Sequence, residues 1–359
     1  MESSARLSVM RIHSCVLLVA CGLGFAALTS PLAYGQGAAA PASVAPRVAA
    51  QNALFEEYYQ AVLKLSPETA TAYGDYRYND KLDDYSLKGI EDEHKIEDGY
   101  LARLKAISTE GFAEQDALSH ELLVRTLEQY DANYRLREYE MPVSHFRGVH
   151  LNMSDLPLSM PFDSVKHYED YVARLHQIPR VFTETEEVIR AGMKDNLVQV
   201  KFLLEKIPGQ TDGIIKANPF LIPTTKYPSS ISAADQARLT KQITDAVNND
   251  VLPAYKSFGD FIAKDYAPRG RTTLSIKSLP GGDERYANAI RARTTVSDMT
   301  ADQIHELGLK EMERIQGEML AIAKWIVAAL GHRSDAAKLG ASNRSAFLRA
   351  DILSRFTQL

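Results

Sequence analysis

Apolar residues recur three and four positions apart along most of this chain, and this spacing places them on one face of an α-helix. The segments with this spacing are residues 53–65, 86–107, 114–140, 164–177, 180–193 and 198–206. Strand patterns are sparse, and TTLSIKSL at 272–279 is the best of them. We therefore expect a mainly α-helical fold, a multi-helix array or bundle with at most a short strand or hairpin near 272–282.

Two further helices carry signals at their ends. Ser232 has the side chain of an N-cap and precedes an apolar stripe that reaches Pro253, which is expected to kink or end the helix. Thr300 and Gln303 form the pattern of a capping box. The apolar stripe that follows them is expected to end at Gly331.

Composition and charge exclude some functions. The chain has 359 residues, of which 45% are hydrophobic and 24% are charged, as in globular proteins with a substantial core. The formal net charge is −5, and no long basic run occurs. Nucleic-acid binding therefore has no electrostatic support.

The first 35 residues differ from the rest of the chain. Arg6 and Arg11 precede an apolar run at 15–30, and Ala33 and Gly35 occupy the small-residue positions of a cleavage site. This is the pattern of a secretory signal peptide, cut near Gly35. An uncleaved membrane anchor is the alternative, although the run is shorter than the roughly 20 residues of a membrane span.

Leu18-Val19-Ala20-Cys21 resembles a lipoprotein cleavage box. Apolar sequence continues past Cys21, where a lipoprotein normally turns polar, so lipid anchoring is the less favoured alternative. We expect an exported protein, periplasmic or extracellular, without membrane contact once the signal is removed. Cys15 and Cys21 are the two cysteines of the chain, so the mature part is expected to have no disulfide, thiol nucleophile or cysteine-bound zinc.

The common zinc-peptidase motif is absent from the sequence. His120-Glu121 and His305-Glu306 begin like His-Glu-x-x-His, in which two histidines four apart on a helix hold the metal. In both places an aliphatic residue stands four positions after the histidine. No catalytic residue is assigned from the residues alone.

His145, His150 and Asp155 are the remaining weak candidates for a metal site, close together in VSHFRGVHLNMSD. Ordinary hydrogen bonding within a loop is the favoured alternative. Residues 74–86 carry four aspartates but lack the spacing and the glycine of a calcium loop. A turn with aspartate caps is expected there.

Residues 278–295 read SLPGGDERYANAIRARTT, in which a proline and two glycines precede a helical pattern. Glycine has no Cβ, so another chain can approach such a turn closely. Pro280, Gly281, Gly282 and Tyr286 are therefore candidates for a cleft that binds a peptide substrate. The slightly favoured alternative is a structural turn that leads into a helix over 283–293.

The stretch from 278 to 319 resembles a bacterial family known as domain of unknown function 885. The shared features are a Leu-Pro-Gly-Gly turn, a tyrosine soon after it, a Thr-Thr pair and an Ile-His-Glu-Leu-Gly helix start. Residues 74–86, 160–180 and 251–268 also look similar to that family. The resemblance spans about residues 50–330.

This resemblance implies a mainly α-helical, exported protein similar to zinc metallopeptidases of the carboxypeptidase or dipeptidase type. In full-length members, the implied zinc-site residues include a His-Glu and a Pro-Gly-His-His run in a C-terminal half. The present sequence contains no Pro-Gly-His-His. We therefore expect no metal ligands and no cofactor in this chain, whereas zinc is implied for full-length members.

The expected organisation has four segments. They are a signal peptide at 1–35, a flexible linker at 36–46, a helical domain at 47–333 and a divergent, truncated C-terminus at 334–359. On this hypothesis the chain is the N-terminal portion of a peptidase-like protein, inactive alone, and needs a missing C-terminal half or a second polypeptide. The alternative is a non-enzymatic periplasmic helical protein that binds peptides or serves as a scaffold.

Overall fold

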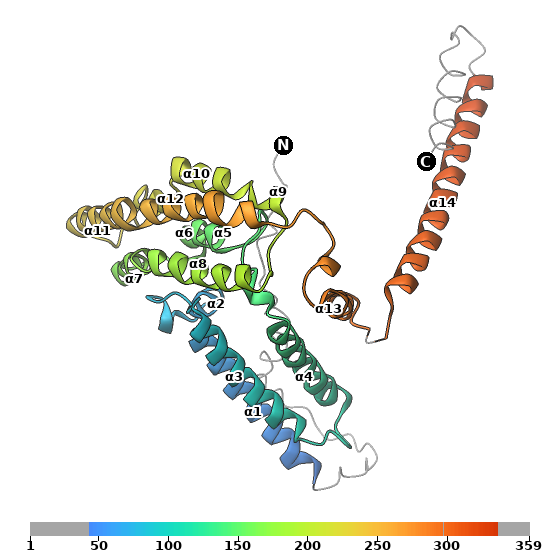
Figure 1. Cartoon of the computed structure of the whole chain (residues 1–359), viewed down its shortest axis with the longest axis horizontal. Coiled ribbons are helices and arrows are strands. Elements are labelled where there is room, and N and C mark those ends of the chain that lie inside the picture. Colours follow the sequence, from blue (N-terminus) through green and yellow to red (C-terminus); the bar gives the residue numbers. More distant parts are fainter. Residues whose placement is uncertain (1–42, 297, 337–359) are drawn as a thin grey trace, which may run out of the picture. The chain divides into compact units, whose positions relative to one another are not determined.

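A computed structural model describes residues 43–296 and 298–336. The chain divides into two compact units, one up to Gly282 and one from Asp283 onward. Within the described residues all regular elements are helical and no strand is formed (Figure 1). The expected mainly α-helical array is therefore confirmed.

The first unit begins with three long helices that lie along one another (Figure 1). They are α1 (Val44–Leu65), α3 (Leu87–Lys105) and α4 (Glu114–Arg135), and the short elements α2 (Pro67–Ala72) and η1 (Tyr76–Tyr78) connect α1 to α3. Their facing sides bury a cluster formed by Leu54, Tyr58, Leu101, Leu104, Leu123 and Leu127. The first helix includes the last residues of the expected linker, and the expected signal peptide lies outside the described residues.

A larger group of helices completes this unit. In chain order they are η2 (Glu138–Glu140), α5 (Val149–Ser154), α6 (Leu156–Ser159), α7 (Val165–Leu175), α8 (Ile178–Lys194), α9 (Lys201–Leu204), α10 (Ile207–Ala217), η3 (Pro219–Thr224), α11 (Ala233–Ala246) and α12 (Leu252–Phe261). α12 packs against α8 and α10, and α11 packs against α7. At their centre the ring of Phe182 lies 4.8 Å from that of Phe258 and 4.9 Å from that of Tyr255. Burial of such rings contributes strongly to a core.

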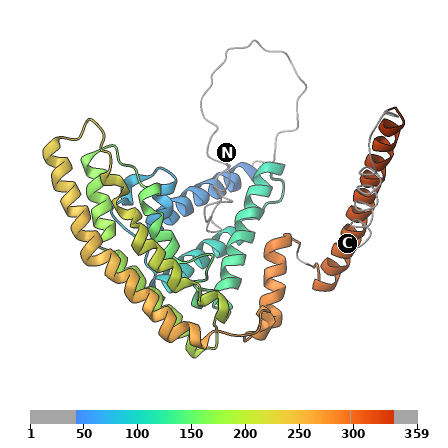
Figure 2. The ribbon, with the colours of Figure 1, turned by 90° about the horizontal axis from the view of Figure 1, so that it is seen from above.

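Residues 233–266 form one long helical rod (Figure 2). The Oγ of Ser232 accepts a hydrogen bond from the N–H of Asp235 at 3.1 Å, which confirms the predicted N-cap. The π-helical turn η4 (Val247–Val251) joins α11 to α12, and a second one, η5 (Ile262–Tyr266), follows α12. Pro253, which was expected to kink or end the helix, does not end the rod. The hydrogen bonds of η4 are π-helical, and a new α-helix, α12, begins after it. Pro253 stands in the first turn of α12, where a backbone N–H has no partner within the helix, so its missing N–H is tolerated there.

Residues 272–279 do not form the expected strand. After η6 (Ala267–Arg269), the described residues form only an isolated parallel bridge between Val200 and Arg271. The guanidinium of Arg271 donates to the carbonyl oxygens of Thr273 and Leu274 at 2.6 and 2.8 Å, and η7 (Ile276–Ser278) follows. These carbonyls thus accept hydrogen bonds from an arginine of the same segment, and no described strand pairs with them.

The second unit contains α13 (Gly282–Thr294) and α14 (Ala301–Ala336). The N–H of Gln303 donates to Thr300 Oγ1 at 3.2 Å, and the N–H of Thr300 donates to Gln303 Oε1 at 2.8 Å, which confirms the capping box. The predicted end of α14 at Gly331 is wrong, because one glycine inside a helix costs only about 1 kcal/mol. In the described part of the chain, no helix is both long and apolar enough to cross a membrane.

Candidate functional site

The Pro-Gly-Gly turn links η7 to α13. Pro280 and Gly281 are exposed, whereas Gly282 is buried. Gly281 has a φ of 66°, a left-handed conformation that other residues rarely adopt. A Cβ on Gly282 would lie 2.1 Å from the carbonyl oxygen of Lys277. Gly281 thus forms the turn, and Gly282 can lie against the backbone of Lys277 because it has no Cβ.

Tyr286 lies one helical turn into α13, and its side chain is 37% exposed. The glycines have structural roles that require no ligand, and these roles support the alternative of a turn that leads into a helix. The peptide-binding role of Pro280, Gly281, Gly282 and Tyr286 stays a prediction.

Gln210 of α10 connects the two histidines that were candidates for a metal site. Its Nε2 donates to the carbonyl oxygen of His145 at 2.8 Å, and its Oε1 lies 3.2 Å from His150 Nε2. The Tyr255 hydroxyl donates to the carbonyl oxygen of His150 at 2.8 Å. Burial lowers the pKa of His150 to about 4, so its imidazole is neutral at neutral pH. These bonds tie the loop before α5 to α10 and α12.

The local sequence explains why this loop turns sharply. Gly148 has a φ of 142°, and a Cβ there would lie 2.8 Å from the side chain of Val143 and 3.1 Å from His150 Nδ1. The N–H of Ser144 donates to the carbonyl oxygen of Arg147 at 2.7 Å and closes the turn. Glycine at 148 therefore lets His150 sit beneath the loop.

The structure gives no support to His145, His150 and Asp155 as a metal site. Asp155 is exposed, and His150 Nε2 is directed to Gln210. The Nδ1 atoms of both histidines are buried without a hydrogen-bond partner. However, no group of three or more His, Cys, Asp or Glu side chains that could hold a metal occurs in residues 43–296 and 298–336. Zinc in proteins normally has three or four such ligands, so these residues do not fit a zinc ion and no zinc-dependent step is assigned to them.

Aspartates of the 74–86 segment act as caps, as expected. Asp83 accepts hydrogen bonds from Ser66 Oγ at 2.8 Å and from the N–H of Glu68 at 3.1 Å, at the start of α2. Asp75 caps η1. The backbone N–H groups of a helix's first turn have no partner within the helix, so a carboxylate that accepts hydrogen bonds from them stabilises the helix.

Arg174 of α7 also holds this part of the chain, and the sequence analysis missed it. The guanidinium is fully buried. Its Nε donates to the carbonyl oxygen of Lys81 at 2.8 Å, and its Nη2 donates to the carbonyl oxygen of Pro67 at 3.0 Å and to Thr71 Oγ1 at 2.7 Å. Burial lowers the pKa of Arg174. The buried guanidinium of Arg174 thus fixes α2 and the family-like segment 74–86 to α7.

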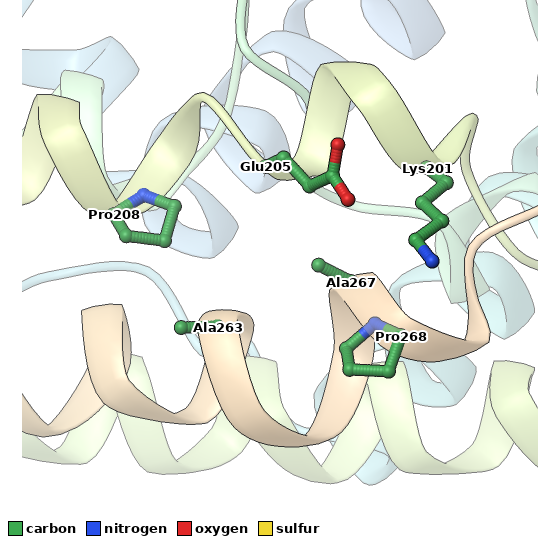
Figure 3. Close-up of a pocket in the computed structure, with 6 residues that line it drawn as sticks. All are labelled: Lys201, Glu205, Pro208, Ala263, Ala267 and Pro268. Carbon is green, nitrogen blue, oxygen red and sulfur yellow. The ribbon is translucent and has the colours of Figure 1, made fainter.

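A pocket of about 380 Å³ lies between α9 and the segment from η5 to η6 (Figure 3). It is lined by Lys201, Glu205, Pro208, Ala263, Ala267 and Pro268. The two charged side chains come from α9 and its C-terminal end, whereas the facing wall has only alanine and proline (Figure 3). The volume falls in the range of small-molecule sites, roughly 300–1,000 Å³.

Two glycines allow close contacts between the elements that border this pocket. A Cβ on Gly270 would lie 2.7 Å from the Cα of Lys201, and a Cβ on Gly259 would lie 2.4 Å from Thr211 Oγ1. The backbone after η6 therefore approaches the backbone of α9 closely at Lys201, which lines the pocket. Sequence reasoning missed this site, and the only signal for it is the pair of glycines in an otherwise helical pattern.

The fold defines an all-α protein built as an array of packed helices. A sequence model of the family described as "Bacterial protein of unknown function (DUF885)" matches residues 67–358. The chain belongs to this family, as the resemblance implied. A search of curated proteins found no match.

A crystal structure with a similar fold is that of the "putative lipoprotein from Colwellia psychrerythraea", with a TM-score of 0.67 and 19% sequence identity. The match covers 79% of the present chain and 52% of the solved chain. At this identity the likeness shows the fold alone. The chain spans about half the length of that protein.

Proposed function

We propose that this chain is the N-terminal portion of an exported zinc-peptidase-like protein of the carboxypeptidase or dipeptidase type, and that it has no peptidase activity alone. The observation that carries the proposal is the match to only about half of the solved protein that shares its fold. The sequence also lacks the Pro-Gly-His-His run implied for full-length members. Among the described residues, no set of side chains replaces that run as a metal site.

In this proposal the helical array forms one side of a substrate cleft, and a second polypeptide segment supplies the metal and the catalytic residues. The apolar side of α14 supports the need for such a partner. Its exposed apolar residues are Leu307, Leu309, Met312, Ile315, Met319, Ile322, Trp325 and Ile326. Apolar stripes of this length are usually covered by protein.

Metal content and peptide cleavage test the inactivity of the chain. We expect inductively coupled plasma mass spectrometry to find no stoichiometric zinc in the purified chain, prepared without chelators. We also expect no cleavage of di- and tripeptides after zinc is added. One zinc per chain together with cleavage that a chelator abolishes would contradict the proposal.

Reconstitution tests the missing portion. Mixing the chain with the C-terminal half of a full-length family member should give a complex on size-exclusion chromatography. Met319→Asp in the apolar stripe should weaken the complex, whereas the control Lys324→Asp should not. A chain that stays a stable monomer, ignores the added half and binds peptides without cleaving them would favour the alternative, a non-enzymatic binding or scaffold protein.

Export is part of the same proposal. Cell fractionation should recover the chain from the periplasm or the medium without residues 1–35. If the chain is lipid-anchored instead, Cys21→Ser will release it from the membrane fraction. Recovery of the uncut chain in the cytoplasm would exclude export.

A further inference from the structure

We propose that the pocket between α9 and the η5–η6 segment binds a small zwitterion, a free amino acid or a dipeptide. Lys201 binds the carboxylate of this ligand, and Glu205 binds its ammonium group. The inference goes beyond the proposed function, because it rests on the pocket alone and holds whether or not the chain is part of a peptidase.

The two charged side chains of the pocket have no partner within the described part of the fold. The side chains of Lys201 and Glu205 make no ion pair or hydrogen bond with another described residue. They stand four apart, a spacing at which lysine and an acidic residue commonly pair. Other lysines of this unit do pair with the acid four positions later: Lys166 with Asp170, Lys241 with Asp245 and Lys256 with Asp260. Lys201 and Glu205 do not pair in this way, because α9 ends at Leu204, and both side chains border the pocket (Figure 3).

Small side chains and a close backbone contact shape the pocket. A Cβ on Gly270 would lie 2.7 Å from the Cα of Lys201, so the backbone after η6 lies directly against a residue that lines the pocket. The wall opposite Lys201 presents Ala263 and Ala267, whose small side chains leave the space unfilled. The fold therefore keeps the space without help from a ligand, which lowers the cost of binding.

The pocket wall that faces α9 contains a π-helical turn. Ala263 lies within the π-helical turn η5, and Ala267 follows it directly. Single π-helical turns are rare and occur frequently at functional sites, because they interrupt the regular ladder and displace side chains. A π-helical turn that lines a pocket is a second, independent pointer to binding.

The charges and the size select the ligand. A lone anion would meet the carboxylate of Glu205, and a lone cation would meet the ammonium group of Lys201. A ligand that carries both charges satisfies both, and charge-assisted hydrogen bonds are the stronger kind. The apolar wall of Pro208, Ala263 and Pro268 suits a small aliphatic side chain between the charged ends. A volume of about 380 Å³ suits a ligand no larger than a short peptide.

Alanyl-alanine is the probe for a direct test with the purified chain. Titration followed by ¹H–¹⁵N NMR should shift the amide signals of Lys201, Glu205 and Ala263 in a saturable way. Two blocked analogues test the charges without changing the protein. N-acetyl-alanyl-alanine lacks the ammonium group and alanyl-alanine amide lacks the carboxylate, so each should bind about tenfold more weakly or not at all.

Three substitutions test the residues. Lys201→Met and Glu205→Gln should each weaken binding of alanyl-alanine about tenfold, and Ala263→Leu should abolish it by filling the pocket. Lys206→Met is the matched control, since Lys206 is exposed next to Glu205 but does not line the pocket. It should bind as the unchanged chain does.

The outcomes separate this inference from the proposed function. Saturable binding that needs both charges of the ligand and an open pocket supports the inference, even if the chain cleaves no peptide. No saturable shifts at tens of millimolar dipeptide would overturn it. Equal binding of the blocked analogues would overturn it too, and this result does not depend on whether any variant folds. Neither negative result affects the zinc and reconstitution tests of the proposed function.

Discussion

Gln210 Oε1 lies 3.2 Å from His150 Nε2 in the core of the first unit, and the imidazole stacks on Phe258 with 6.1 Å between ring centroids. Burial lowers the pKa of His150 from 6.5 to about 4. When the pH falls below 6.5, the unfolded chain therefore takes up a proton before the folded chain does. The contribution of His150 to stability is complete above pH 6.5 and is lost as the pH falls through 4.

The first prediction concerns this histidine. His150→Gln removes the titrating group, so the free energy of unfolding should fall less between pH 6.5 and 4 than it does in the unchanged chain. Urea unfolding at several pH values measures the difference. His305→Gln is the matched control, because His305 is exposed on α14 and its loss removes no buried group. Parallel curves for His150→Gln and the unchanged chain would show that His150 titrates normally in the fold.

Glu97 of α3 should give the opposite pH dependence. Burial, and then the nearby Glu93, raise its pKa from 4.5 to about 8. The folded chain therefore holds this proton where the unfolded chain has lost it. The contribution of Glu97 to the free energy of unfolding is fully present below pH 4.5 and is lost as the pH rises through 8.

The second prediction follows from that carboxyl group. Glu97→Gln keeps the shape of the side chain but cannot ionise, so it should raise the free energy of unfolding at pH 8 by about 1–2 kcal/mol. The gain should vanish near pH 4.5. Asp98→Asn, at an exposed position of the same helix, should change stability by less than about 0.5 kcal/mol. A Glu97→Gln protein that is less stable at both pH values would mean that the ionised carboxylate is a favourable partner in the fold.

The helical class of the fold could be predicted from periodicity, because most helices bury an apolar stripe. α10 was missed, since it contains Pro208, Gly209 and Gly213, which weaken a helical pattern. Tertiary packing stabilises α10, because it lies so close to α12 that a Cβ on Gly259 would be 2.4 Å from Thr211 Oγ1. The strand prediction at 272–279 failed for a similar reason, because the bonds of Arg271 outweigh the β-propensity of that segment.

The candidate sites show the same limit. Roles that depend on near neighbours were predictable, and Asp75, which accepts a hydrogen bond from the N–H of Arg77 at the start of η1, is one case. The pocket brings Lys201 and Glu205 against Ala263 and Ala267, about sixty positions later in the chain. No local pattern encodes that pairing. Arg174 was also unpredictable, since nothing in one helix reveals that its guanidinium will bind carbonyl groups of another segment.

The third prediction tests the Pro-Gly-Gly turn. Gly282→Ala places a Cβ 2.1 Å from the carbonyl oxygen of Lys277, so it should lower the free energy of unfolding by about 1–3 kcal/mol through forced backbone movement. Gly213→Ala in α10 is the control, because a Cβ there has open space and should stabilise the helix by up to about 1 kcal/mol. Thermal unfolding measures both changes. A Gly282→Ala protein of full stability would remove the structural explanation and favour the ligand-binding one.

The last prediction concerns Arg174, whose guanidinium joins α7 to carbonyl groups at Pro67 and Lys81. Arg174→Met keeps an apolar chain of similar length but leaves those buried acceptors without a donor. We expect a loss of about 3–5 kcal/mol, as for other buried charged groups whose partners are stranded. Hydrogen exchange should rise first between residues 67 and 82, because that segment loses its attachment to the core.

Arg125→Met is the control for this substitution. Arg125 is exposed on α4 and pairs with Glu121 at 3.6 Å, so its loss should cost less than about 1 kcal/mol. Both substitutions remove one positive charge, but only Arg174→Met removes a buried one, so the difference in stability loss between them measures the effect of burial. If both variants lose equal stability, or if exchange rises uniformly through the first unit instead of in the 67–82 segment, Arg174 does not act as the attachment described here. If hydrogen exchange in Arg174→Met rises mainly between residues 67 and 82, the attachment to α7, and not the turns of segment 74–86 alone, holds that segment in position.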